Sequence, residues 1–342
     1  MSWQAIVRHI DNLRSQNRYP QKIDLSSELG GFFGQHRSGW PYVLSLLEKL
    51  HTPGGIILDS FIERTFCWHP DGPGAHREPW IGFIHVPPRV PDWFQSEQAN
   101  DTIFHTGNWQ KSLPYCRGLF TLSHYHRQNL EKKLALPIDN LVFPTETPAL
   151  TWSWQRFSLN PEKKIVQVGW WLRKLHTIFQ LPTPPHKYQK IFLKVTHTDL
   201  DSLMKKEREI LLRQGEFDDS MYQTARSISF IPDDQYDRLL AENIVIINLY
   251  DASANNTIIE CLARNTPILV NPIEPVIEYL GRDYPFYFSS LEEAARKAED
   301  LDLIYSTHQF LRHHPLKEKL TGRYFLESFV NSGIYKNLAE CP

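Results

Sequence analysis

The chain has 342 residues and a formal net charge of −2, from 37 Lys and Arg against 39 Asp and Glu. Hydrophobic residues make up 41% and charged residues 22%, which is ordinary globular usage and excludes a largely disordered chain. The near balance of charge argues against a protein that binds nucleic acid over its whole surface. The length predicts two domains.

The four cysteines, Cys67, Cys116, Cys261 and Cys341, show no paired spacing. Scattered cysteines are typical of reduced thiols in the cytoplasm. The sequence predicts no signal peptide and no membrane span, because no apolar run approaches about 18 residues. Residues 3–13 could form an amphipathic helix, which we expect to pack as a first helix, with a membrane-surface anchor as the alternative. We therefore expect a cytoplasmic protein, with peripheral membrane contact left open.

The first half alternates strand-like runs with helical spacing, which favours a parallel sheet with crossover helices. A loop rich in glycine, at 30–34, follows the first run. The predicted strands are 22–26, 56–62, 80–86, 118–123 and 140–143, and the predicted helices are 42–50, 109–115 and 124–134.

Residues 144–161 carry Pro144, Pro148 and Pro161 without a clean period, and we interpret them as the link between two halves. The alternation then restarts, and the apolar run 243–249 is typical of a strand buried on both faces. The predicted strands are 164–169, 190–195, 227–231, 243–249 and 267–270; a loop and helix at 170–181, helices at 203–213, 233–242, 257–263 and 291–301, and helical segments over 304–338 complete the chain.

Two such halves joined by one linker predict two sheets that face each other across a cleft. Ligands bind beyond the carboxyl ends of parallel strands. We therefore expect the loops at Gly30, His85, Gly169 and Asp251 to face this cleft.

The stretch 244–279 is the most specific in the chain. A buried strand runs into Asp251, a polar turn follows, and a helix opens near Thr257 with Glu260 one turn inside it. The free N–H groups and dipole of a helix start suit a phosphate, and a carboxylate one turn further can accept both hydroxyls of a ribose. The stretch therefore predicts a nucleotide-diphosphate site, with a plain strand–helix unit and a solvated Glu260 as the alternative.

This layout resembles the carboxy-terminal half of GT-B glycosyltransferases of the glycogen-synthase and mannosyltransferase type. Glu260 matches the second Glu of that family's motif, which binds the ribose of the donor nucleotide, and Asn265-Thr266-Pro267 matches its step into the next strand. The family's first Glu lies eight residues earlier, where this chain has Ala252, and Asp251 lies nine residues earlier. Either Asp251 substitutes with a shift of one residue, or the role of the first acid is absent.

The resemblance implies an α/β fold of two Rossmann-like domains, with a C-terminal helix that crosses back to the first domain. We expect an acceptor-binding domain at 1–148, a nucleotide-sugar-binding domain at 149–316, and C-terminal helices at 317–342 that pack on the first domain.

The resemblance also covers the run KIVQVGWWLRK at 164–174, since that family's first strand in this half ends in Gly before a diphosphate-binding Arg and Lys. It implies that Arg173 and Lys174 hold the donor diphosphate together with Asn255, Asn256 and Thr257 at the helix start. Two cations would stabilise the charge of the leaving diphosphate without a metal. The alternative is that Arg173 and Lys174 are surface charges.

In the first half, the loop around Gly31 resembles that family's phosphate-approaching glycine loop, with a bare tight turn as the alternative. Residues 35–38 would then lie near the cleft. His85 stands where that family has a strand-end His near the transferred sugar, and an unperturbed imidazole suits general-base work. The resemblance thus implies that His85 and Asp251 are the catalytic residues; a His85 satisfied by backbone groups is the alternative.

Cys67, His69, Asp71 and His76 have the side-chain types of zinc ligands, but no second Cys lies nearby, and we interpret the segment as a loop. We expect no metal site and no cofactor beyond a nucleotide-diphosphate sugar as co-substrate. Patterns of acyl hydrolases, P-loop kinases and HExxH metalloproteases are absent from the sequence.

The sequence therefore predicts a glycosyltransferase, retaining and independent of metal, with a hexose as the expected sugar and an acceptor that the sequence does not name. One alternative is a transferase of the same fold that acts on nucleic acid or protein, with a basic face near Arg37, Arg89, Arg117 and Arg127. A second is a non-catalytic partner subunit of this fold, which the residue Ala252 favours.

Overall fold

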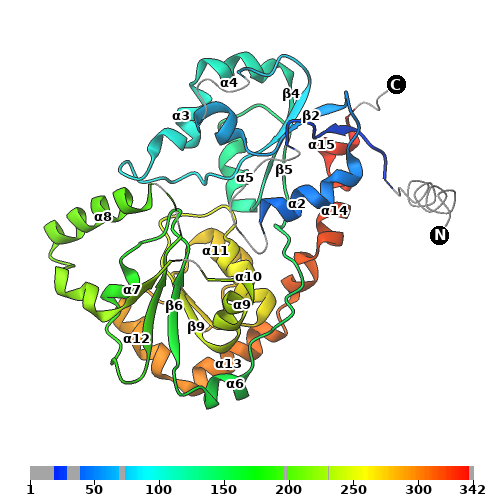
Figure 1. Cartoon of the computed structure of the whole chain (residues 1–342). Helices are drawn as coiled ribbons and strands as arrows, with labels where there is room; N and C mark the ends of the chain where they lie inside the picture. The colour runs from blue at the N-terminus through cyan, green and yellow to red at the C-terminus, as the bar shows by residue number, and fades with distance from the viewer. Residues whose placement is uncertain are drawn as a thin grey trace, which may run out of the picture.

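The computed structural model describes residues 19–28, 39–68, 74–195, 197, 199–229 and 231–338. It contains two five-stranded sheets, and every strand pair in both sheets is parallel. Figure 1 shows the first sheet with its helices above the second. Because each parallel pair needs a crossover, the alternation of strands and helices along the chain is the pattern that this architecture requires.

The first sheet has its strands in chain order, β1-β2-β3-β4-β5. They are β1 (Ile23–Asp24), β2 (Ile56–Asp59), β3 (Trp80–Phe83), β4 (Cys116–Thr121) and β5 (Ile138–Asn140). The last strand begins two residues before the predicted 140–143, because Ile138 already pairs with Leu119, while the Phe143 amide donates to the hydroxyl of Tyr279 instead of to the sheet.

The second sheet has the order β10-β9-β6-β7-β8. Its strands are β6 (Lys164–Val168), β7 (Gln189–Leu193), β8 (Arg226–Ile228), β9 (Ile244–Ile247) and β10 (Ile268–Val270). All four residues of β9 are fully buried, as its apolar run predicts for a central strand covered on both faces.

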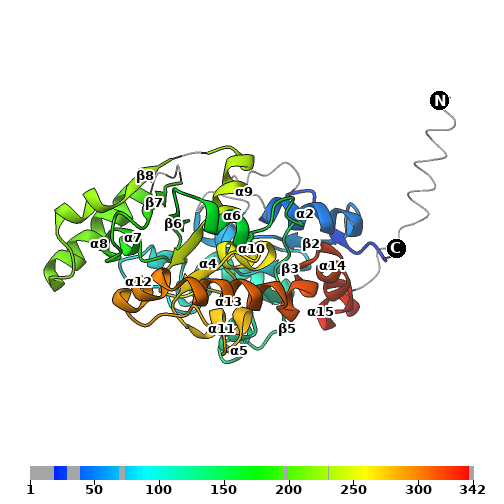
Figure 2. The same ribbon diagram turned by 90° about the horizontal axis from the view of Figure 1, so that it is seen from below.

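Helices cover both sheets (Figures 1 and 2). The α-helices are α2 (Trp40–Leu47), α3 (Asn100–Phe104), α4 (Gly107–Ser112), α5 (His124–Glu131), α6 (Trp154–Leu159), α7 (Thr177–Gln180), α8 (Leu200–Gln214), α9 (Asp233–Glu242), α10 (Asn256–Arg264), α11 (Glu274–Leu280), α12 (Leu291–Glu299), α13 (Leu301–Arg312), α14 (Gly322–Asn331) and α15 (Gly333–Lys336). Shorter helical turns are η1 (Glu48–Leu50), the π-helical η2 (Arg64–Trp68), η3 (Ser96–Gln98), η4 (Leu113–Tyr115), η5 (Asp219–Thr224) and η6 (Pro315–Leu320). The sequence did not predict α3, α6 and α11, of which α6 lies within the link at 144–161, and the predicted helix within 170–181 is only α7.

Side chains of the first sheet alternate between two apolar clusters, as period-two geometry requires. Trp80 and Leu119 pack with α3, α4 and α5 on one face, whereas Phe83 and Phe120 belong to the main core on the other. The ring of Phe329 in α14 lies 6.1 Å from that of Phe83 and 4.8 Å from that of Phe120. The C-terminal helices therefore cross back to the first sheet, as expected, and cover its second face (Figure 1).

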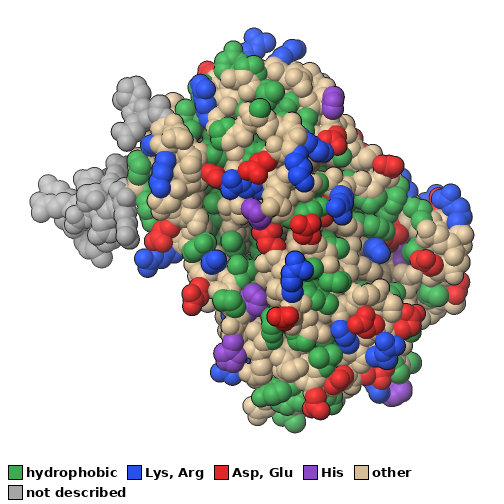
Figure 3. Space-filling model, turned by 180° about the vertical axis from the view of Figure 1, so that it is seen from behind, with side chains coloured by type: hydrophobic (Ala, Val, Ile, Leu, Met, Phe, Trp, Pro, Cys, Tyr) green, Lys and Arg blue, Asp and Glu red, His purple; other side chains and the backbone are tan. Residues whose placement is uncertain are grey.

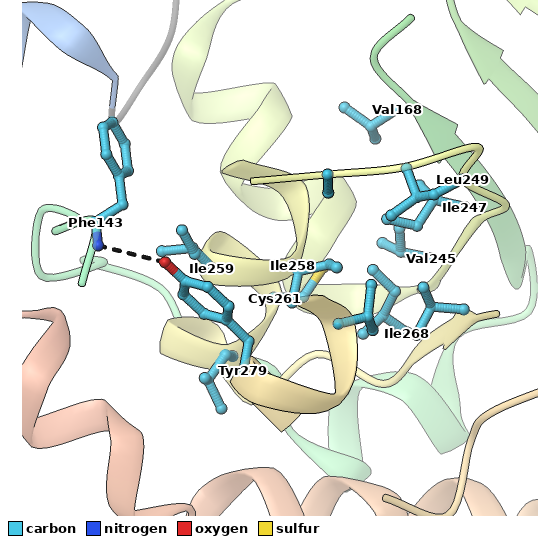
Figure 4. Packing of buried hydrophobic residues seen from close by; sticks show 14 of the residues in the cluster. Phe143, Val168, Val245, Ile247, Leu249, Ile258, Ile259, Cys261, Ile268 and Tyr279 are labelled. Carbon is cyan, nitrogen blue, oxygen red and sulfur yellow. Dashed lines mark hydrogen bonds between the residues drawn. The ribbon is translucent and has the colours of Figure 1, made fainter. Parts of the chain in front are cut away.

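The helix α10 is held between the second sheet and α11 by its apolar face. Ile258, Ile259 and Cys261 are buried in one cluster with Val245 of β9 and Ile268 of β10 (Figure 4). Burying each such side chain stabilises the fold by roughly 1.5–3 kcal/mol. The N-terminus of α10 is thereby fixed at the carboxyl end of the second sheet.

Candidate functional site

The strand order of the second sheet reverses at β6, which lies between β7 and β9. At such a switch point two loops leave neighbouring strands in opposite directions, and ligands bind in the crevice between them. We call residues 169–176 the β6 loop and residues 248–255 the β9 loop. They are joined by backbone hydrogen bonds from Lys174 to Asn248 (2.7 Å) and from Tyr250 to Leu172 (3.0 Å).

Arg173 places a buried cation between these loops and α10. Its side chain lies against Gly169, where φ is +81° and an added Cβ would meet the guanidinium carbon at 2.6 Å. One guanidinium nitrogen, Nη2, donates to Thr257 Oγ1 (3.1 Å) and Asn255 Oδ1 (3.3 Å), and Nη1 donates to the Trp171 carbonyl (2.9 Å). Burial lowers the pKa of Arg173 to about 10, so the group stays charged at neutral pH.

The start of α10 places backbone N–H groups, which have no partner within the helix, beside this cation. Asn255 caps the helix by accepting from the Ile258 amide (3.3 Å), and Asn256 is its half-buried first residue. One turn inside, Glu260 is 3% exposed and accepts a hydrogen bond from the Tyr236 hydroxyl (2.5 Å). Glu260 follows Thr257, the hydrogen-bond partner of Arg173, by three residues, so the two lie on the same face of α10.

Lys174 lies in different surroundings from Arg173. Its side chain is exposed, and its ammonium group lies 5.8 Å from the centre of the Tyr250 ring. A cation over an aromatic face is weakly held and can reorient toward an anion.

Asp251, in the β9 loop, is only 4% exposed and lies at the contact between the two halves. It accepts hydrogen bonds from the Arg89 amide (2.9 Å) and the Tyr125 hydroxyl (3.0 Å), both from the first half. Burial raises the pKa of Asp251, although these hydrogen bonds act in the opposite direction. In this structure, groups of the first half thus occupy the carboxylate that we expected to face the cleft.

A second polar contact joins the halves beside Asp251. The His126 ring lies 2.9 Å from Ser253 Oγ through Nδ1 and 3.0 Å from Asn100 Oδ1 through Nε2. Burial lowers the pKa of His126 to about 3, so the ring is neutral; Nε2–H then donates to Asn100 and Nδ1 accepts from the Ser253 hydroxyl. The cleft is closed here by direct contact.

His85 follows β3 and lies among groups of its own half. Its Nε2 lies 2.9 Å from the Ser60 carbonyl, and its ring stacks on Phe61 with centroids 3.9 Å apart. Burial lowers the pKa of His85 to about 4, so Nε2–H donates to Ser60 and Nδ1 is left as an acceptor.

The structure therefore brings together Arg173, Asn255 and Thr257 of the predicted residues, with Asn256 beside them and Glu260 one turn further along α10. Lys174 and Asp251 are on the two joined loops, and no described hydrogen bond links Asp251 to His85. Gly31 and residues 35–38 lie outside the described residues, as do residues 3–13, His69, Asp71 and Cys341.

Sequence reasoning missed Tyr125 and His126, which lie at the start of α5. Ser123 caps this helix by accepting from the His126 amide (3.3 Å), and the residues after it reach the other half. Their only sequence signal is two polar aromatic side chains in the first turn of a short helix that follows a buried strand.

Within the described residues, no group of three or more His, Cys, Asp and Glu is arranged to hold a metal ion. Of the segment with zinc-ligand side chains, His76 bonds to Asp59 (2.9 Å) and Cys67 donates to the Glu97 carbonyl. No helix in the described part of the chain is both long and apolar enough to cross a membrane.

Comparison of the chain with protein-family models and with curated proteins finds no match. Solved structures do match. The sucrose-phosphate synthase of Thermosynechococcus elongatus superposes over 85% of this chain and 75% of its own, with a TM-score of 0.58 and 12% identity. The HepE protein of Anabaena, in complex with UDP and glucose, matches over 74% and 71% of the two chains, with a TM-score of 0.57 and 10% identity. The chain has the GT-B fold.

A UDP-forming trehalose-phosphate synthase of Burkholderia vietnamiensis agrees with this assignment, with a TM-score of 0.56 and 12% identity over 84% of this chain and 77% of its own. The expected fold class is thus confirmed. The domain limits at 148 and 316 stay a prediction, although the two sheets divide between β5 and β6.

Proposed function

We propose that this GT-B protein transfers a sugar from a nucleotide-diphosphate sugar to an acceptor held by its first half. One observation carries the proposal: a buried cation, Arg173, is fixed at the start of α10 at the switch point of a doubly wound sheet. The helix dipole and the guanidinium both favour an anion at this place. Structures of similar fold include an Anabaena protein in complex with UDP and glucose, which supports a nucleotide sugar as donor.

Each predicted site residue that the structure describes has a role in this proposal. Arg173, Lys174 and the helix start at 255–257 hold the diphosphate, and Glu260 holds the ribose. Lys174 would turn from the Tyr250 ring toward the phosphates. The cations stabilise the charge that accumulates on the leaving diphosphate, so the proposed reaction requires no metal.

Asp251 and His85 face the transferred sugar in the proposed complex. Asp251 can do so only after the halves separate, because the Arg89 amide and the Tyr125 hydroxyl now occupy it. Reclosure around the donor would exclude water and suppress hydrolysis. By resemblance to its family, we propose that the anomeric configuration is retained.

The first test is a thermal-shift screen of the purified chain against nucleoside diphosphates and nucleotide sugars. A ligand that binds the folded state raises stability by RT ln(1 + [L]/Kd). We expect selective stabilisation by the members of one base series, and Glu260→Gln should reduce it. Glu209→Gln serves as the control, since it changes an exposed carboxylate on α8. No shift with any nucleotide at millimolar concentration contradicts the proposal.

A non-catalytic subunit of the same fold is the second candidate. Two observations favour it: Ala252 stands eight residues before Glu260, and Asp251 is bonded to the first half. Stoichiometric copurification with an active transferase, and no turnover of any donor by the chain alone, would select this candidate.

A nucleic-acid acceptor receives less support. Of the residues proposed for a basic face, Arg127 pairs with Glu131 (2.7 Å) and Asp139 (3.7 Å), and Arg37 lies outside the described residues. Figure 3 shows cationic and anionic side chains interspersed over one face of the molecule. Salt-sensitive binding of duplex DNA would reinstate this acceptor class.

A further inference from the structure

A buried carboxylate on α8, Glu207, connects both loops of the switch point. One oxygen, Oε2, accepts from the His176 backbone amide (3.0 Å) and from the ring nitrogen Nδ1 of the same residue (2.6 Å). The other, Oε1, accepts from the Tyr250 hydroxyl (2.6 Å). Glu207 is 1% exposed and His176 is fully buried, so water does not compete for the bonds between these two residues.

The two residues that Glu207 holds are next to the proposed donor-binding groups. His176 ends the β6 loop, two residues after Lys174. Tyr250 lies in the β9 loop, directly before Asp251. Hydrogen bonds to a charged, buried acceptor are among the stronger ones in proteins, so Glu207 fixes both loops relative to α8.

Tyr250 extends this arrangement to the other half of the molecule. Its ring lies 5.6 Å from that of Trp93 and 6.4 Å from that of Phe94, both in the first half, and 5.8 Å from the Lys174 ammonium group. The hydrogen bond from its hydroxyl to Glu207 therefore sets the orientation of a ring that lies against both the Lys174 ammonium group and the two aromatic rings of the first half.

We propose that Glu207 is a positioning residue: it holds the β6 and β9 loops in register, so that Arg173, Lys174 and Asp251 are placed for the donor. This inference rests on the proposed function for the identity of the ligand, but the coupling of the two loops can be measured without any ligand. Glu207 touches neither donor nor acceptor, and it acts through His176 and Tyr250.

Four single variants of the full chain test the proposal. Glu207→Gln removes the charge of the acceptor. Its amide oxygen can still accept from His176, but its amide nitrogen can only donate, so the hydrogen bond with the Tyr250 hydroxyl must reverse and all three bonds become weaker. Tyr250→Phe removes only the hydrogen bond that joins Glu207 to the β9 loop. Tyr222→Phe removes a hydroxyl that is hydrogen-bonded to the other ring nitrogen of His176, Nε2 (2.8 Å). It leaves the hydrogen bonds of Glu207 to both loops in place. Glu209→Gln makes the same chemical change on the exposed side of α8.

Amide hydrogen exchange is the readout that needs no ligand. We expect exchange in peptides covering 169–176 and 248–255 to become about tenfold faster in Glu207→Gln, because a loop that loses a bond to a charged acceptor opens more often. Tyr250→Phe should affect 248–255 alone, and the two controls should leave both loops within about twofold of the wild type. Unchanged exchange in both loops of Glu207→Gln overturns the proposal.

The dissociation constant of the nucleoside diphosphate that stabilises the wild type, with UDP tested first, is the second readout. It should rise about tenfold in Glu207→Gln and less in Tyr250→Phe. Faster exchange with an unchanged dissociation constant would show a purely structural bond and would overturn the positioning role. If no diphosphate binds the wild type, the proposed function fails, and the exchange data alone decide whether Glu207 couples the loops. Should Glu207→Gln fail to fold, Tyr250→Phe carries both readouts.

Discussion

The carboxyl ends of β6 and β3, one in each sheet, differ in the charge of the groups that surround them. The second sheet holds a buried cation, Arg173, with polar partners at a helix start. The first sheet ends in a neutral His85 beside a fully buried acid, Glu63. Burial raises the pKa of Glu63 to about 7 and lowers that of His85 to about 4, so both groups are biased toward their neutral forms. The surroundings of Arg173 therefore favour an anion, whereas those of His85 favour an uncharged group. Elsewhere at the carboxyl end of the first sheet, Glu28 pairs with Arg64 (2.5 Å) and Asp59 with His76 (2.9 Å).

Topology agrees with this contrast. The order β10-β9-β6-β7-β8 has a switch point, whereas the order β1-β2-β3-β4-β5 has none. A sheet wound in chain order creates no crevice between diverging loops, so its strand ends can serve as a wall that closes on the other half. The bonds from Arg89 and Tyr125 to Asp251 are such a closing contact.

The largest expected effect comes from removing the cation. In Arg173→Met, we expect the affinity for the nucleoside diphosphate to fall about 100-fold, because a charge-assisted contact in a buried site is lost. Arg226→Met is the matched control, since Arg226 is exposed on the edge strand β8 of the same sheet. Isothermal titration measures both. Equal affinities in the two variants would show that the second half does not bind the anion through Arg173.

Two glycines, one in each half, allow the roles of the two halves to be tested separately. An Ala at 169 would put its Cβ 2.6 Å from the Arg173 guanidinium carbon, and an Ala at 118 would put its Cβ 2.7 Å from Ile334 in α15. We expect Gly169→Ala to weaken diphosphate binding about tenfold, because the guanidinium must shift. Gly118→Ala should lower the melting temperature and leave binding unchanged. A loss of binding in Gly118→Ala would break the division of roles.

The strands of the second sheet could be predicted within a few residues, because runs such as 244–247 are continuously apolar and bounded by polar turns. The cluster at α10 could also be predicted, since Asn255, Thr257 and Glu260 lie on one helix turn or the next. The contact of Asp251 with the first half could not be predicted, because its partner Tyr125 is 126 residues away. Contacts between the halves depend on how two sheets meet, and no local period encodes that.

The contact that closes the halves gives a third effect, on stability and not on binding. Tyr125→Phe leaves the buried Asp251 with one hydrogen bond fewer, and we expect the free energy of unfolding to fall by about 1–2 kcal/mol. Chemical denaturation measures this loss. Tyr305→Phe is the control, because Tyr305 is 44% exposed on α13. If Tyr125→Phe is as stable as the wild type, the halves are not held together through Asp251.

The smallest effect concerns Glu63 and its pH dependence. Its Oε1 accepts from the amides of His85 (2.8 Å) and Val86 (2.7 Å), but its Oε2 has no hydrogen-bond partner within the described part of the chain. A carboxyl whose pKa is raised by folding binds more protons in the folded state. Its contribution to stability is therefore full below the unfolded pKa of about 4.5 and is lost as the pH rises through about 7.

The lowered pKa values of His85 and His126 act in the opposite direction. A His that is buried in its neutral form stabilises the fold less as the pH falls below the pKa of the unfolded chain. The contribution of Glu63 is therefore obtained from the difference in free energy of unfolding between the wild type and Glu63→Gln. Between pH 5.5 and 6.5, we expect the wild type to lose about 1 kcal/mol more stability than the variant. Denaturant unfolding at the two pH values measures this difference. Parallel curves would show that Glu63 is charged in the folded state, and the surroundings of His85 would then hold a charge, as those of Arg173 do.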